Sequence, residues 1–146
     1  KLLHFGGWKK LNNSKVSKEI FNKEVAKKLK ISDQNILDVY GFSEQLGTIY
    51  VSKGLGGCKV SNFSHILIRD PKSLKVVEDG KVGFMQFLSV LPLSYPGVSI
   101  LNDDMGYISK RTFEKNIEKI EFKVESRLDK LELRGCGDTL PDHYYI

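Results

Sequence analysis

Cysteine is scarce in this sequence, since its 146 residues include only Cys58 and Cys136. Two cysteines cannot build the disulfide framework of a small secreted domain, and neither has the Cys-x-x-Cys spacing of a metal site. No apolar run is long enough to cross a bilayer, and the first eleven residues lack the apolar stretch and cleavage site of a secretory signal. These absences predict a protein of the cytoplasm with no membrane span.

Acidic residues are also in the minority, with 18 Asp and Glu against 23 Lys and Arg and a formal charge of +5. Much of the excess lies in residues 9–30, where apolar residues recur at helical spacing. A solvated lysine-rich helix face explains this pattern. A nucleic-acid interface would usually interleave aromatic and basic side chains, so we predict no nucleic-acid partner.

The remaining composition, 40% hydrophobic and 28% charged, is typical of a globular domain with a real core. It is not the composition of a disordered tail. Residues 2–5 look like a strand that runs directly into a Gly-Gly turn. We therefore expect the chain to begin inside a fold and to be a fragment of a longer protein.

The first third predicts a β-α-β unit, with strands at 2–5 and 36–40 and a helix from about 17 to 30. Ser17 is a suitable N-cap for that helix. An apolar stripe at helical period consists of Val16, Ile20, Phe21, Val25, Ala26 and Leu29. A crossover of this kind implies parallel strands, and open α/β sheets bind ligands at the carboxyl ends of their strands.

The later residues predict mostly β structure, separated by glycine and proline turns. Strands are expected at 48–52, 64–69, 82–90, 98–101, 120–124 and 131–133. The segment 111–119 is ambiguous between a loop and a short helix. The predicted fold class is α/β: a β-α-β unit of a parallel sheet, then a β-rich, barrel-like subdomain. We divide the chain at 1–50, 51–110 and 111–146, the last being a C-terminal extension.

Chemically useful groups follow the predicted strand 36–40 in the run Tyr40-Gly41-Phe42-Ser43-Glu44. At the carboxyl end of a strand, this run offers an aromatic face for a purine and a glycine that allows close backbone approach. Its hydroxyl can bond a phosphate oxygen, and its carboxylate can hold Mg²⁺. A plain turn is the alternative interpretation of so short a motif.

A second run, Asn102-Asp103-Asp104-Met105-Gly106, follows the predicted strand 98–101. A carboxylate at Asp104 can accept hydrogen bonds from both hydroxyls of a ribose. Asn, Asp and Gly also suit a β-turn, and a turn would be a good place from which to present Asp104.

Taken in chain order, these motifs resemble the adenylate-forming ligases, and within them the LuxE-type acyl-protein synthetases of the bacterial luciferase fatty-acid reductase system. The resemblance covers nearly the whole chain. Its pieces are 4–11 with Gly-Gly-Trp-Lys-Lys, 40–50 with Tyr-Gly-Phe-Ser-Glu, 68–71, 93–101 with Tyr-Pro-Gly, 104–106, and 132–138 with Arg-Gly-Cys-Gly-Asp. The Tyr-Gly-x-Ser-Glu piece is common to the superfamily, whereas the first and last pieces indicate the acyl-protein branch.

The resemblance implies ATP and Mg²⁺ as cofactors and assigns a role to each matching residue. Gly6 and Gly7 would line the adenine pocket, Tyr40 would pack on the adenine ring, and Gly41 stays a nucleotide-binding candidate through close backbone approach. Ser43 would contact the α-phosphate, Glu44 would bind Mg²⁺ and Asp104 would hold the ribose. Arg127 would reach the ribose or phosphate, although Ser126 replaces the glycine that usually precedes this arginine.

Cys136 lies between two glycines that leave its sulfur open, and Arg134 nearby would favour the thiolate. In the resembling family an acyl-cysteine near the C-terminus is the enzyme-bound intermediate, so the resemblance makes Cys136 the acyl acceptor. The alternative is a small buried hydrophobe. Cys58, in a different context, is interpreted as a loop thiol.

The implied function is activation of a carboxylic acid, fatty in character, as acyl-AMP, with transfer to a cysteine thiol. An acyl-accepting protein or a reductase subunit is the implied partner. The loop that cradles the ATP phosphates and the domain carrying the catalytic lysine have no counterpart in the chain, so we expect the isolated fragment to be inactive. Two alternatives stay open: a coenzyme A ligase of the phenylacetate type, and a non-catalytic partner-docking domain.

Overall fold

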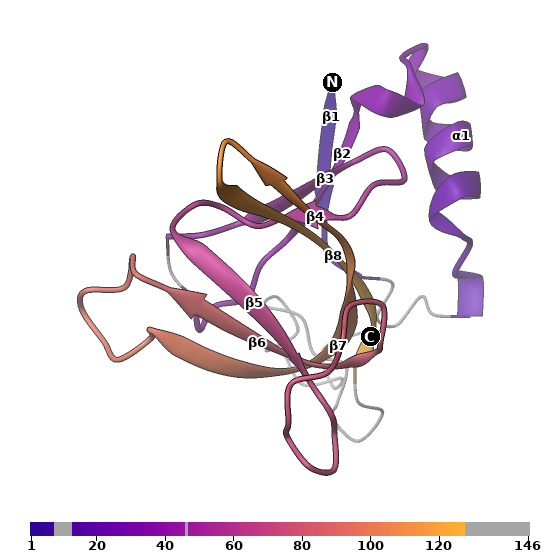
Figure 1. Ribbon diagram of the computed structural model, residues 1–146. Coiled ribbons are helices and arrows are strands. Elements are labelled where there is room, and N and C mark those ends of the chain that lie inside the picture. Colours follow the sequence, from indigo (N-terminus) through magenta and orange to yellow (C-terminus); the bar gives the residue numbers. More distant parts are fainter. Residues whose placement is uncertain (8–12, 46, 128–146) are drawn as a thin grey trace, which may run out of the picture.

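The computed structural model describes residues 1–7, 13–45 and 47–127. Its elements are β1 (Leu2–Phe5), α1 (Lys18–Leu29), the short 3-10 helix η2 (Asp33–Asn35), β2 (Ile36–Tyr40), β3 (Tyr50–Lys53), β4 (Cys58–Lys59), β5 (Ser64–Arg69), β6 (Gly83–Ser89), β7 (Ser99–Glu114) and β8 (Ile117–Arg127). Within the described residues the strands form one sheet in the order β1-β2-β3-β4-β8-β7-β6-β5 (Figure 1).

The first strand pair is parallel, with Leu2 opposite Ile36 and Phe5 opposite Val39. Each of the other described pairs is antiparallel. Helix α1 provides the crossover that a parallel pair requires. The predicted β-α-β unit, the β-rich remainder and the α/β class are therefore confirmed.

The sheet curls strongly, as one ring contact shows. Tyr50 on β3 and Phe87 on β6 have ring centroids 5.2 Å apart. The two strands are four places apart in the sheet order. Neighbouring strands lie about 4.8 Å apart, so a flat sheet would separate these strands by roughly 19 Å. The two ends of the sheet must therefore fold toward each other, which gives the barrel-like shape.

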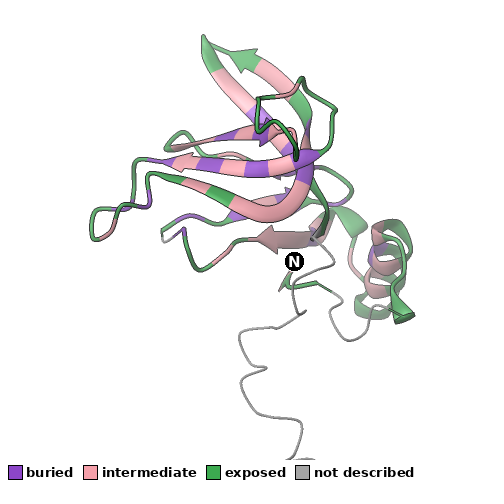
Figure 2. Ribbon diagram, turned by 90° about the horizontal axis from the view of Figure 1, so that it is seen from below, coloured by how far each residue is buried: buried purple, intermediate pink, exposed green. Residues whose placement is uncertain are grey.

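The core fills the inside of this curl. It consists of Tyr50, Cys58, Ile66, Ile68, Met85, Phe87, Ile108, Ile120 and Phe122. Along β6 every second residue is buried, the alternation of a strand with one face on a core (Figure 2). The interpretation of Cys58 as a loop thiol is wrong, because Cys58 starts β4 and is only 7% exposed.

Helix α1 packs at the β1–β2 end of the sheet through polar contacts (Figure 1). Lys18 Nζ lies 3.3 Å from Asp38 Oδ2 and donates a hydrogen bond to Ser52 Oγ at 2.8 Å. One turn later, Asn22 is 2% exposed and its Nδ2 donates to the Gly54 carbonyl at 3.2 Å. Polar residues at i and i+4 thus form hydrogen bonds from the helix to β3 and to the turn that follows it.

The predicted helix start is confirmed, since the Ser17 side chain caps α1 by accepting from the Ile20 N–H at 3.3 Å. The apolar stripe is only partly a packing face. Phe21, Val25 and Ala26 are half-buried. Ile20 and Leu29 are 53% and 52% exposed, because α1 turns Lys18 and Asn22 toward the strands instead.

The ambiguous segment 111–119 is neither a helix nor a long loop. It is the tip of a β7–β8 hairpin in which Glu114 pairs with Ile117. The two turn residues, Lys115 and Asn116, have φ of 49° and 64°. Two consecutive left-handed residues produce the tight turn that matches the twist of paired strands.

The alternative interpretation of residues 102–106 as a β-turn is wrong. These residues lie within β7, and the pairing register shifts between Met105 and Gly106 on the β8 side. A β-bulge of this kind re-aims neighbouring side chains without ending the strand.

The division at 1–50, 51–110 and 111–146 stays a prediction. The boundary between 110 and 111 falls inside β7, and β8 pairs with both β4 and β7. The strand expected at 131–133 lies outside the described residues.

Candidate nucleotide site

The candidate site begins where the two parallel strands end side by side. Because Phe5 pairs with Val39, the chain leaves β1 at Gly6 next to the last residue of β2, Tyr40. Gly6 has a φ of +98°, a conformation that favours glycine. A Cβ added at Gly6 or Gly7 would meet no atom within 4 Å, so both glycines border open space.

Tyr40 and Asp104, which are 64 residues apart in sequence, are in direct contact. The Tyr40 hydroxyl donates a hydrogen bond to Asp104 Oδ2 at 2.7 Å. It also accepts one from Asn102 Nδ2 at 3.1 Å, while Asn102 Oδ1 accepts from the Asp104 N–H at 3.0 Å. Burial and the adjacent Asp104 carboxylate raise the pKa of Tyr40 well above its usual range, so the hydroxyl stays a donor.

The Tyr40 ring belongs to an aromatic cluster that continues into the core. Its centroid lies 5.8 to 6.3 Å from those of four other rings, Phe42, Tyr50, Phe87 and Phe122. Such rings restrict one another, since aromatic pairs prefer defined offset or edge-on geometries. The cluster therefore fixes the direction of the Tyr40 hydroxyl. Stacking of this ring on adenine stays a prediction.

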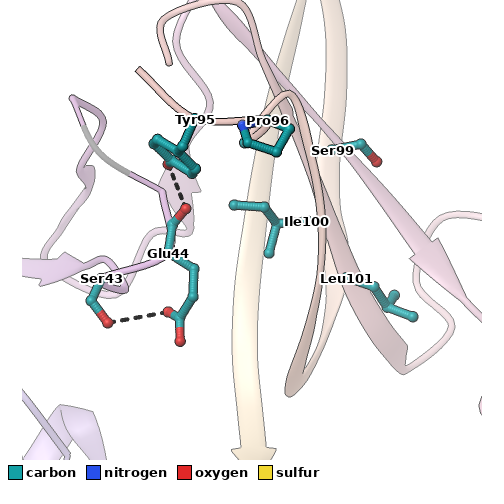
Figure 3. Close-up of a pocket in the computed structure, with 8 residues that line it drawn as sticks. Ser43, Glu44, Tyr95, Pro96, Ser99, Ile100 and Leu101 are labelled. Carbon is teal, nitrogen blue, oxygen red and sulfur yellow. Dashed lines mark hydrogen bonds between the residues drawn. The ribbon is translucent and has the colours of Figure 1, made fainter. Parts of the chain in front are cut away.

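Ser43 and Glu44 lie on the wall of an open cleft of about 610 Å³ (Figure 3). The rest of the lining comes from residues 95–97 and 99–101. Ser43 Oγ donates to Glu44 Oε2 at 3.3 Å, and both residues are exposed. Gly41, at the start of the same loop, is exposed too, and an added Cβ there would touch Ile49 at 3.6 Å. The loop thus presents a hydroxyl and a carboxylate together.

Arg127 ends β8, and its Cα is the register partner of Asp104 on β7. The main chain therefore brings these two predicted ribose residues to one position of the sheet. Cys136 and its neighbours 134–138 lie outside the described residues, as does Trp8. Among the described residues, no group of three or more His, Cys, Asp or Glu side chains is placed to hold a metal by itself.

Sequence reasoning missed two polar contributors to this region. Asn102 bonds both Tyr40 and Asp104, although it stands in the same Asn-Asp-Asp run that drew attention to Asp104. Tyr95 donates to the Glu44 carbonyl at 2.5 Å. The only sequence signal for Tyr95 was its Tyr-Pro-Gly context, which gives no hint of a partner 51 positions away.

Tyr40→Phe tests how much the Tyr40 hydroxyl contributes. The substitution keeps the ring cluster but removes the hydrogen bonds to Asp104 and from Asn102. Since hydrogen bonds to charged groups are worth about 1.5–3 kcal/mol, the free energy of unfolding should fall by roughly that amount. Denaturant titration measures it. Tyr107→Phe, which removes a hydroxyl from the same strand as Asp104, is the control. Equal stability of both variants would contradict the expectation.

The fold matches solved enzyme structures at low sequence identity. The luciferase-like enzyme of the nonluminescent Zophobas morio mealworm has a TM-score of 0.55 at 18% identity, covering 89% of this chain and 31% of that one. A benzoate CoA ligase from Burkholderia xenovorans gives 0.53 at 14%, covering 90% and 27%. McyG A-PCP complexed with phenylalanyl-adenylate gives 0.53 at 17%, covering 88% and 25%. The fold is that of the adenylate-forming ligases.

The sequence comparisons identify a family that is more specific than the fold. The family described as acyl-protein synthetase, LuxE, matches residues 1–145, and the chain belongs to that family. It is 24% identical over 133 residues to the long-chain-fatty-acid–luciferin-component ligase of Aliivibrio fischeri, covering 90% of this chain and 35% of the relative. For the Vibrio harveyi protein of the same name the values are 25% over 135 residues, 90% and 34%. The chain therefore spans about a third of these relatives.

No helix in the described part of the chain is both long and apolar enough to span a membrane.

Proposed function

We propose that the protein carrying this chain is an ATP-dependent acid–thiol ligase that activates a fatty acid as acyl-AMP and transfers the acyl group to a cysteine thiol. One observation carries the proposal. The Tyr40–Asp104 hydrogen bond joins the two runs to which the resemblance assigns adenine and ribose binding. They meet at the carboxyl end of parallel strands, where α/β sheets bind nucleotides. Membership of the acyl-protein synthetase family supports the same chemistry.

In this proposal the strand-end groups bind adenosine. Gly6 and Gly7 leave room for the adenine next to Tyr40, and Gly41 follows Tyr40 directly on the exposed loop. Asp104 accepts hydrogen bonds from the ribose hydroxyls, and Arg127, its register partner, reaches the ribose or α-phosphate. Ser43 donates its hydroxyl hydrogen to an α-phosphate oxygen.

Glu44 is the proposed carboxylate for Mg²⁺, and its surroundings fit that ion. Mg²⁺ keeps most of its water ligands and is typically held by one or two carboxylates together with substrate phosphates. A single exposed carboxylate on an open cleft suits this mode better than an all-protein cage. When bound, Mg²⁺ neutralises phosphate charge in the nucleotide.

The chemistry proceeds in two displacements. An oxygen of the acid attacks the α-phosphorus of ATP, the bond to the β-phosphate oxygen breaks, and pyrophosphate leaves. The Cys136 thiolate then attacks the acyl carbon, the bond to the AMP oxygen breaks, and a thioester forms. Within the described residues no Lys or Arg lines the cleft, so we propose that the charge developing on the phosphates needs a further cation besides Arg127. Residues 1–146 alone are proposed to be inactive.

The proposed substrate, partner and compartment follow from the same chemistry. The substrate is a fatty carboxylic acid, and the acyl group passes on to an acyl-accepting protein or a reductase subunit. The proposed compartment is the cytoplasm, where a free catalytic thiol stays reduced.

The direct test is the complete protein incubated with ATP, Mg²⁺ and a panel of acids, followed by intact-mass measurement and acid-dependent pyrophosphate exchange. We expect exchange with fatty acids and a covalent acyl adduct that requires ATP. A reaction without ATP is the control. Acyl transfer to free coenzyme A in preference to the protein's own thiol would favour a coenzyme A ligase. Absence of both pyrophosphate exchange and nucleotide binding would favour a docking domain.

A further inference from the structure

Tyr95 connects two distant segments at the cleft. Its hydroxyl donates to the carbonyl oxygen of Glu44 at 2.5 Å, a bond that Figure 3 shows as a dashed line between two residues that line the cleft. The acceptor is the main chain. The contact therefore constrains the backbone of Glu44 and leaves its carboxylate exposed.

The position of the Tyr95 ring is itself fixed by Gly97. A Cβ at Gly97 would overlap the ring, so the ring lies directly against the backbone of this buried glycine. The Gly97 N–H also donates to the Tyr95 carbonyl at 2.8 Å, which closes a tight turn around Pro96. The hydroxyl is thus held in place by a glycine that no larger residue can replace without moving the ring.

The loop is anchored on its other side by Gln45. This side chain is 3% exposed, and its Oε1 accepts from the Tyr50 hydroxyl at 2.8 Å inside the core. The Gln45 N–H donates to the Phe42 carbonyl at 3.2 Å. Glu44 therefore lies between an inner anchor at Gln45 and an outer anchor at Tyr95.

We propose that Tyr95 is a positioning residue for Glu44: the Tyr95–Glu44 hydrogen bond holds the loop so that the carboxylate faces the cleft in one orientation. The inference rests on the proposed function, because a fixed carboxylate matters for a metal bound with a nucleotide. A side chain whose backbone is fixed loses less conformational freedom when it becomes a ligand. Tyr95 itself touches neither metal nor phosphate in this proposal.

Tyr95→Phe tests the inference in the complete protein, with Tyr107→Phe as the matched control. In the protein without ligand, the backbone amides of residues 41–45 should exchange hydrogen for deuterium faster, because the hydrogen bond to the Glu44 carbonyl is lost. The Gln45 anchor remains. The Mg²⁺ concentration for half-maximal pyrophosphate exchange should rise about 3- to 10-fold, the range expected for one lost hydrogen bond. The KM for the acid should stay unchanged. Gly97→Ala, which keeps the hydroxyl but displaces the ring, should shift both quantities in the same direction.

The two readouts separate the inference from the function on which it rests. Unchanged hydrogen exchange in Tyr95→Phe, or an unchanged Mg²⁺ requirement, overturns the positioning role. A parallel rise in the KM for the acid also overturns it, since that would indicate general damage to the cleft. Absence of acid-dependent pyrophosphate exchange in the unsubstituted protein overturns the proposed function, and hydrogen exchange then decides the anchoring role independently of activity.

Discussion

Glu44→Gln in the complete protein is expected to reduce acyl-AMP formation by at least roughly 100-fold, or about 3 kcal/mol of transition-state stabilisation. The substitution removes the negative charge that would hold Mg²⁺. The loop itself should keep its shape, because its anchors use the Glu44 carbonyl and the Gln45 side chain rather than the carboxylate. The loss should therefore be one of chemistry and not of folding.

Acid-dependent pyrophosphate exchange measures this effect, with thermal unfolding as a check on the fold. Glu24→Gln, an equivalent change at an exposed position of α1, serves as the control and should leave exchange unaltered. Wild-type exchange in the Glu44→Gln protein would show that another group holds the metal.

Cys136→Ser should separate the two half-reactions. Adenylation needs the acid, ATP and Mg²⁺ but no thiol, so pyrophosphate exchange should survive. The covalent acyl adduct should disappear, because a serine hydroxyl without an adjacent general base is a far weaker nucleophile than a thiolate. Intact mass with and without hydroxylamine measures the adduct.

Cys58 supplies the control for that experiment. It is buried in β4, and burial raises the pKa of its thiol to about 11, so at neutral pH it is a protonated, inaccessible group. Cys58→Ala should keep the adduct, and alanine avoids placing a hydroxyl in the core. A hydroxylamine-sensitive acyl group on the Cys136→Ser protein would place the nucleophile elsewhere.

Local sequence patterns were sufficient for much of the fold. The strands Leu2–Phe5, Ile36–Tyr40 and Ser64–Arg69 have the predicted bounds, and Ser17 caps α1. These features depend on side chains close in sequence, such as an N-cap or a period-2 alternation. The β7–β8 hairpin was missed because its turn is Lys-Asn rather than the usual Asn-Gly or Asp-Gly.

The arrangement of the site depends on contacts that no local pattern records. The run that contains Asp104 suggested a turn, yet it lies within a strand that pairs on both sides. The polar packing face of α1 is hidden in the sequence because the partners of Lys18 and Asn22 lie on β2, on β3 and just after β3, far outside the local helical pattern. The Tyr95–Glu44 bond has the same character, since only the curl of the sheet brings its two segments together.

The pairing register of the β7–β8 hairpin determines which residues meet at the candidate site. Asp104 and Arg127 pair at its open end, and Glu114 pairs with Ile117 next to the two-residue turn at Lys115–Asn116. The number of residues in each arm therefore decides which residues pair at the open end. A change of one residue in either arm would shift the register, so that a residue other than Arg127 would pair with Asp104. The turn itself favours residues that tolerate a left-handed conformation, and the number of residues between the turn and the site is constrained as well.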